Sequence, residues 1–119
     1  MRKFFKFWLP VLIWAGFIFF VSSLGGEDIP GIFYGQDTIF HLFEYALLAL
    51  LLNRALTNSR YSSLKKSKRL FLVFISCLVY AISDELHQLF VPARESSIAD
   101  IVVDSFGIAL GSIIYRMKT

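Results

Sequence analysis

The residues of this sequence that could most clearly carry out chemistry are paired acidic residues and histidines. Two stretches carry such pairs at a spacing of three, His41–Glu44 and Asp84–His87, and the second stretch, SDELHQLFVPAR, ends at Arg94. General acid–base catalysis commonly uses a histidine beside a carboxylate. The same groups, projecting from helices of a bundle, also bind divalent metals. Both kinds of site are therefore candidates.

The elements that must position these residues are apolar. The chain is 56% hydrophobic, and its apolar segments cover about 5–24, 37–55, 69–90 and 98–115. Each segment approaches the ~20 residues with which a helix crosses a bilayer. The connections are short, and neither a repeat nor a low-complexity linker marks a second domain. The sequence therefore predicts an all-α fold: an integral membrane four-helix bundle made by residues 1–119 as one domain.

Basic residues predict the orientation of this bundle. Of the twelve Lys and Arg residues, all except Arg94 lie near the start of the first segment, around the connection at 54–69, or after the fourth segment. Lys and Arg concentrate in cytoplasmic loops, so both termini are predicted to be cytoplasmic. The net charge of +3 then reflects contact with anionic membrane lipids and not a nucleic-acid partner. Cys77 is the single cysteine, which excludes a CxxC redox or zinc motif.

Acidic residues must lie inside the membrane for three of the segments to reach spanning length. The second segment has to include His41 and Glu44. The third must continue through Asp84, and the fourth needs Asp100 and Asp104. Charged residues within a span usually face the bundle interior or a wet cavity and mark function. Three helices are therefore predicted to bring ionisable groups into one layer below the outer surface.

Helical spacing places these groups on the faces that pack, because residues three, four and seven apart share one side of a helix. The polar faces, in chain order, are Asp37, His41 and Glu44; Asp84, His87 and Gln88; and Asp100 and Asp104 with Gly107 and Gly111. The two glycines form a GxxxG pattern, which allows close approach of helices. This face suits the bundle interior or a homo-oligomer, and the sequence leaves both open.

Negative charge exceeds positive charge in this layer. Six acids, namely Asp37, Glu44, Asp84, Glu85, Asp100 and Asp104, accompany one arginine and two histidines. Carboxylates crowded in a low dielectric cannot all stay ionised without protons, a cation, a metal or a cationic ligand.

Several site chemistries satisfy this balance. A divalent metal held by His41, Glu44, Asp84 and His87, with Asp100 or Asp104 from the fourth segment, is one. Acid–base catalysis on a lipid-linked substrate is another, and a proton- or cation-coupled transport component is a third. In a further alternative the charges only pair with one another, in a non-catalytic structural or interaction protein. Whether the chain is an enzyme stays undecided.

Two segments, DTIFHLFEYALLALLL and SDELHQLFVPARESSIADIVVDSFGIALG, resemble the VanZ-like family of bacterial membrane proteins. The matching positions are Asp37, His41, Phe43 (displaced by one place), Tyr45, Asp84, Glu85, Gln88, Phe90, Pro92, Arg94, Asp100, Asp104, Gly107 and Gly111. Thr38 and Ala93 depart from the family pattern, which often has Lys and Gly there. The resemblance implies a multi-pass protein of the bacterial cytoplasmic (inner) membrane. It also implies association with low-level resistance to teicoplanin, a glycopeptide with a fatty-acyl tail.

Taken together, these features predict an acidic pocket that opens to the outer leaflet and binds or modifies an envelope amphiphile, such as a lipid-linked or lipoglycopeptide ligand. The candidate catalytic residues are His41, Glu44, Asp84, Gln88 and Asp104. The candidate substrate-binding residues are Arg94, Asp37, Glu85, Asp100 and Tyr45. Arg94 is expected to grip an anionic group through its bidentate guanidinium.

Overall fold

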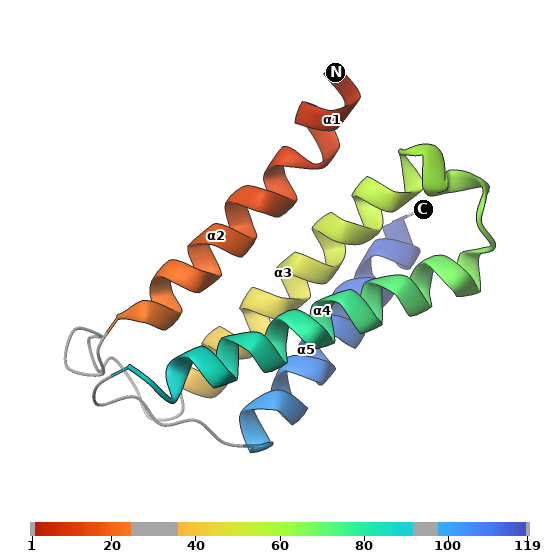
Figure 1. The fold of residues 1–119 in the computed structure, drawn as a ribbon. Helices are drawn as coiled ribbons and strands as arrows, with labels where there is room; N and C mark the ends of the chain where they lie inside the picture. Colours follow the sequence, from red (N-terminus) through yellow and green to blue (C-terminus); the bar gives the residue numbers. More distant parts are fainter. Residues whose placement is uncertain (1, 25–35, 92–97, 119) are drawn as a thin grey trace.

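The computed structural model describes residues 2–24, 36–91 and 98–118, and these residues form helices joined by turns. The helices are α1 (Arg2–Phe7), α2 (Leu9–Ser23), α3 (Gln36–Thr57), the short 3₁₀ helix η2 (Arg60–Ser63), α4 (Lys66–Gln88) and α5 (Ile98–Lys118). Both termini and η2 lie at one end of the bundle (Figure 1). The helix ends next to the connections 25–35 and 92–97 lie at the other.

Four of the helical segments are long and apolar enough to cross a membrane: Phe4–Ser23, Thr38–Thr57, Lys66–Gln88 and Ile98–Met117. Large apolar side chains point outward from them, including Ile13 at 64% exposure, Phe71 at 62% and Phe106 at 67%. So much exposed apolar surface is unfavourable in water but matches the hydrocarbon of a bilayer. The predicted all-α bundle with four membrane helices is confirmed. Which side of the membrane holds the termini stays a prediction.

The first membrane helix is interrupted at Trp8, where α1 ends and α2 begins. Pro10 is the second residue of α2 and has no backbone N–H to donate to the preceding turn. Backbone bonds on either side keep the chain helical: Trp8 N–H donates to Phe4 O at 2.8 Å and Leu12 N–H donates to Trp8 O at 3.1 Å. The proline therefore marks a local break within one span.

Helices α3 and α5 pack backbone against backbone through the two glycines of the GxxxG pattern. A Cβ placed on Gly107 would lie 2.6 Å from Leu42 O, and one on Gly111 would overlap the carbonyl of Ala46. No side chain fits at either position. The GxxxG face therefore serves contacts inside the bundle, as one of the two sequence alternatives proposed.

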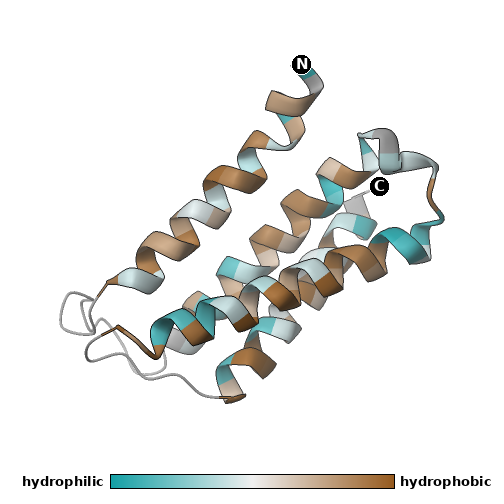
Figure 2. Ribbon diagram, viewed as in Figure 1, coloured by the Kyte–Doolittle hydropathy of each residue, from teal (hydrophilic) through white to brown (hydrophobic). Residues whose placement is uncertain are grey.

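The apolar core lies between α3 and the buried face of α4. Its centre contains Tyr45 and Ala49 from α3 and Val73, Cys77 and Ala81 from α4, each almost fully buried. Towards the α4 C-terminus this face changes from apolar to polar at Asp84. Figure 2 shows teal returning near the C-terminal end of α4, after a mostly brown middle part. The polar end of α4 faces the beginnings of α3 and α5, so the three helices together position the candidate site.

Candidate functional site

Buried polar side chains from α3, α4 and α5 meet near the end of the bundle that lies away from the termini. We call His41, Tyr45, Asp84, Glu85 and Asp104 the polar cluster. All five are buried, with exposures of 6% for His41, 0% for Tyr45 and Asp104, and 3% for Asp84 and Glu85. Each of the three helices contributes at least one of them, so the cluster exists only when these helices are assembled.

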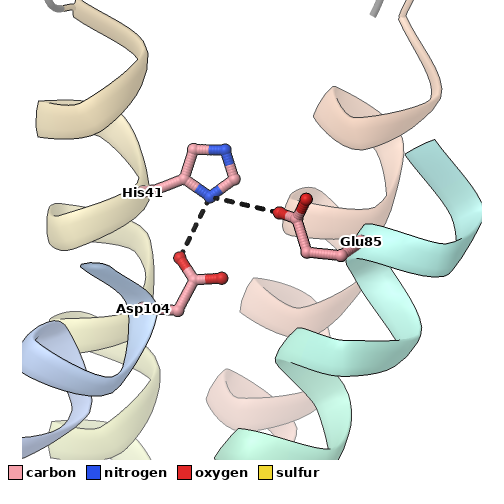
Figure 3. Close-up of side chains that lie close together, drawn as sticks. All are labelled: His41, Glu85 and Asp104. Carbon is pink, nitrogen blue, oxygen red and sulfur yellow. Dashed lines mark hydrogen bonds and ion pairs between the residues drawn. The ribbon is translucent and has the colours of Figure 1, made fainter. Parts of the chain in front are cut away.

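His41 is the centre of this cluster (Figure 3). Its Nδ1 lies 3.0 Å from Asp104 Oδ1 and 3.9 Å from Glu85 Oε1. An ionised carboxylate can only accept, so His41 Nδ1 carries the proton and donates it to Asp104. The other ring nitrogen, Nε2, points away from both carboxylates (Figure 3). A carboxylate that fixes one nitrogen in this way leaves the other as a base or a ligand.

Tyr45 and Asp84 form the second polar pair of the cluster. The Tyr45 hydroxyl donates to Asp84 Oδ2 at 3.1 Å, and both side chains are buried. Among the described residues, Asp84 Oδ1 and Asp104 Oδ2 have no hydrogen-bond partner. Leaving a buried acceptor unpaired costs about 1–3 kcal/mol, and more for a charged one. These two oxygens are therefore ready to accept from water or a ligand, or to bind a cation.

Charge balance and geometry allow two ways of neutralising the cluster. A protonated His41 offsets one of its three carboxylates. Alternatively, once His41 Nδ1 has lost its proton, His41, Glu85 and Asp104 can each offer one ligand atom to a metal ion, since these atoms lie within 4.8 Å of one another. Ligand atoms around a tetrahedral zinc, bound at about 2.0–2.2 Å, lie about 3.3–3.6 Å apart. The distances of 3.0 and 3.9 Å from His41 Nδ1 lie on either side of that range, so small side-chain movements suffice.

This group differs from the metal-binding set expected from the sequence. His41 and Asp104 belonged to the expected set, but Glu85 did not. Glu44 is only half-buried, and His87 lies on the side of α4 that faces α2. The reason is the position of the buried stripe on α4. It runs through Val73, Cys77, Ala81, Asp84, Glu85 and Gln88. Compared with the expected face, which had Asp84, His87 and Gln88, this stripe contains Glu85 in place of His87. Glu85, a candidate substrate-binding residue, is therefore buried inside the cluster.

His87 joins α4 to α2. Its Nε2 lies 2.9 Å from Ser23 Oγ, and its ring stacks on Phe19 with centroids 4.5 Å apart. The same hydroxyl donates to Phe19 O at 2.9 Å. A hydroxyl has one proton, so while Ser23 donates to the backbone it accepts from His87 Nε2–H. In this arrangement His87 is not a base that activates Ser23. Ser23 was not expected at the site, although the SerSer pair closing the first apolar segment was a signal for a polar contact.

Other residues expected at the site lie around the cluster or outside the described part of the chain. Gln88 is buried at 2% exposure, and Asp100 is half-buried in the first turn of α5. The backbone carbonyl of Glu44 accepts from Trp14 Nε1 at 2.9 Å. Asp37 is in the first turn of α3, with its side chain outside the described part, and Arg94 lies outside the described residues. Their roles in binding or catalysis stay predictions.

Comparison with protein families identifies the chain. A family model described as VanZ/LLP1 matches residues 7–119. The chain belongs to the VanZ-like family. The match covers all four membrane helices almost completely, including every residue of the polar cluster. No curated protein and no solved structure matches this VanZ-like chain significantly. It is a multi-pass membrane protein by its family and by its four apolar helices.

Proposed function

We propose that this VanZ-like protein binds or modifies an envelope amphiphile at its polar cluster, from the outer leaflet of the bacterial cytoplasmic membrane. In this proposal its presence lowers susceptibility to lipoglycopeptides such as teicoplanin. The observation that carries the proposal is the excess of buried carboxylates: Asp84, Glu85 and Asp104 accompany the single imidazole of His41. A purely structural pairing requires two opposite charges, and the extra acids then only add a desolvation cost.

The distribution of charge along the chain supports an opening towards the outer leaflet. Lys and Arg near the termini and the α3–α4 connection favour a cytoplasmic location for that end. The polar cluster belongs to the opposite end, where α3 and α5 begin and α4 ends. Arg94 follows α4 in the sequence and is the one Lys or Arg in the two connecting stretches 24–35 and 89–97. We propose that Arg94 binds the anionic group of the amphiphile and that Asp37, Asp100 and Gln88 lie near the entrance to the cluster.

The roles within the cluster follow from its hydrogen bonds. Asp104 fixes His41 so that Nε2 is directed away from the carboxylates, which suits a base or a hydrogen-bond acceptor for the ligand. Tyr45 holds Asp84 by one oxygen, leaving the other for a cationic or hydroxyl group. Glu44, one turn from His41 on α3, adds negative charge nearby. A structural role for the same pairs, locking α3, α4 and α5 together, is the rival explanation.

Teicoplanin susceptibility of a sensitive host tests the proposal. The host expresses the wild-type chain or the near-isosteric variants Glu44→Gln, Asp84→Asn, Glu85→Gln and Asp104→Asn. Ser105→Ala is the matched control, because that hydroxyl donates to Ile101 O of its own helix at 2.9 Å. Membrane levels are compared by immunoblot.

We expect the wild type and Ser105→Ala to protect, and the cluster variants at equal membrane levels to give the susceptibility of the empty vector. Full protection by the cluster variants would assign the charges to the scaffold. Failure of the wild type to protect would contradict the teicoplanin phenotype for this chain.

A further inference from the structure

A basic cavity lies at the end of the bundle that carries the termini, opposite the polar cluster. It has a volume of about 1090 Å³ and lies between α1 and the turn that joins α3 to η2. The residues that give it its chemistry are Arg2, Lys6, Phe7, Trp8, Tyr61 and Ser62. Thr57 is also in its wall, ~24 Å along α3 from His41 at 1.5 Å per residue. The cavity is therefore separate from the candidate site.

Positive charge at this cavity has no acidic counterpart nearby in the sequence. Residues 1–26 and 45–83 contain no Asp or Glu, and all residues that line the cavity fall within these ranges. Arg54 does not line the cavity, but it adds a cation next to it, with Cζ 4.8 Å from the centroid of the Phe7 ring. Lys6 Nζ lies 5.3 Å from the same centroid. Cation–π contacts hold both groups in place and do not neutralise their positive charge, so the cavity favours an anion.

The position of the cavity points to a lipid as the source of that anion. The first membrane helix starts at Phe4 and the second ends at Thr57, and both residues line the cavity. The cavity therefore lies at the level of the lipid headgroups. Trp8 and Tyr61 are aromatic residues of the kind that occupies this interface. Below them, Leu9, Leu12 and Ile13 are exposed on α2 and can contact acyl chains.

We propose that this basic cavity binds the phosphate group of an anionic membrane lipid. Arg2 and Lys6 contact the phosphate, the Ser62 hydroxyl donates to the headgroup, and the acyl chains lie along the exposed apolar side of α1 and α2. A soluble phosphate would gain the charge contacts but not the apolar ones, so the lipid is the better-matched ligand. This site is independent of the function proposed for the polar cluster.

Lipid-dependent thermal stability of the purified full-length protein tests the site. The protein in a neutral detergent is titrated with phosphatidylglycerol, with phosphatidylcholine as the zwitterionic reference and inorganic phosphate as the soluble anion. The test variant is Arg2→Gln/Lys6→Gln. The matched control is Lys66→Gln/Lys68→Gln, which removes the same charge from exposed side chains that do not line the cavity. Circular dichroism without lipid establishes that each variant is folded.

We expect phosphatidylglycerol to stabilise the wild type and the control more than phosphatidylcholine does. For the cavity variant the phosphatidylglycerol concentration at half-maximal effect should rise at least about tenfold, since each basic side chain near anionic lipid contributes about 1 kcal/mol. Lys6→Arg should bind as the wild type does.

Three results would overturn the site. Equal losses of stabilisation by phosphatidylglycerol in the test and control variants would mean that the lipid is attracted by the surface charge in general. No loss in either variant would mean that the cavity does not bind the lipid. Stabilisation by inorganic phosphate that matches phosphatidylglycerol would make the ligand a soluble anion. If Arg2→Gln/Lys6→Gln does not fold, the single variants Arg2→Gln and Lys6→Gln decide by the same comparison.

Discussion

His41 on α3 donates a hydrogen bond of 3.0 Å to Asp104 on α5, and both side chains are buried. Only Nδ1 of the ring takes part in this contact, and Nε2 points away from it. The ring therefore has one nitrogen engaged in holding the helices and another oriented for a ligand. These two roles are separable by substitution, because different amide side chains reproduce different nitrogens of histidine.

His41→Asn places an amide N–H near the position of Nδ1 and leaves no group at the position of Nε2. We expect His41→Asn to keep most of the unfolding free energy, measured by circular dichroism in mixed detergent micelles. His41→Ala should lose about 3–5 kcal/mol, because it leaves Asp104 buried without its partner. Both variants should lose teicoplanin protection, because the proposed function assigns ligand binding to Nε2. Protection by His41→Asn would show that Nδ1 alone is sufficient.

Gly111→Ala should disrupt the contact between α3 and α5. A Cβ at this position overlaps the backbone of Ala46, so the helices must separate and the cluster must open. Overpacking of this kind costs about 1–3 kcal/mol of unfolding free energy. Gly16→Ala is the control, because a Cβ there has no neighbour within 4 Å and alanine favours the helix by up to about 1 kcal/mol. Equal effects at both glycines would contradict the close approach of α3 and α5.

Tyr45 and Asp84 should be energetically coupled. Tyr45→Phe removes the donor of the 3.1 Å hydrogen bond and should lower the unfolding free energy by about 1–3 kcal/mol. In combination with Asp84→Asn, the two effects should differ from their sum by about 0.5–3 kcal/mol. Tyr45→Phe with Ser105→Ala is the reference pair and should be additive. Additivity in both pairs would show that the Tyr45–Asp84 hydrogen bond does not contribute to the stability of the cluster.

His87 is expected to attach α2 to α4 and to have no part in the chemistry of the cluster. His87→Phe keeps an aromatic ring against Phe19, and His87→Ala does not, so the second variant should be less stable by about 0.5–1.5 kcal/mol. Teicoplanin protection should survive in His87→Phe. Loss of protection at normal membrane level would favour the metal-binding set that includes His87, and measurement of bound metal in the purified protein would follow.

The predicted orientation can be tested with cysteines in a Cys77→Ala background. Ser63→Cys, in η2 between α3 and α4, should react with a membrane-impermeant maleimide only after the cells are permeabilised. A cysteine at position 32, between the first two membrane helices, should react in intact cells. The reverse pattern would place the polar cluster towards the cytoplasm and exclude a ligand from the outer leaflet.

The sequence was sufficient to predict the membrane helices, because their length and hydropathy are local properties. The expected segment 69–90 differs only at its ends from the helix Lys66–Gln88. Close helix packing through Gly107 and Gly111 was also predicted, because residues without large side chains let two backbones approach. The sequence left the partner helix open, and the structure shows it to be α3. His41 and Asp104 were expected on packing faces from their spacing alone.

The exact membership of the cluster could not be read in the same way. Asp84 and Glu85 are adjacent, so spacing alone predicts that they point to different sides of α4. Both are buried because α4 contacts α3 and α5 together, which widens its buried face. Likewise, the contact of His87 with Ser23 depends on where α2 lies beside α4, and no pattern within either segment determines that position. Rotation of helices about their axes and the choice of neighbours are properties of the assembled bundle.

The order in which the chain is made gives α3 a special part in membrane insertion. Asp84 and Glu85 lie near the end of α4, and the groups that face them, the Tyr45 hydroxyl and the His41 imidazole, belong to α3. Asp104 of α5 also has its partner, His41, on α3. An acid without a partner is costly inside a membrane. Helices α4 and α5 should therefore enter the bilayer against α3, which is made before both.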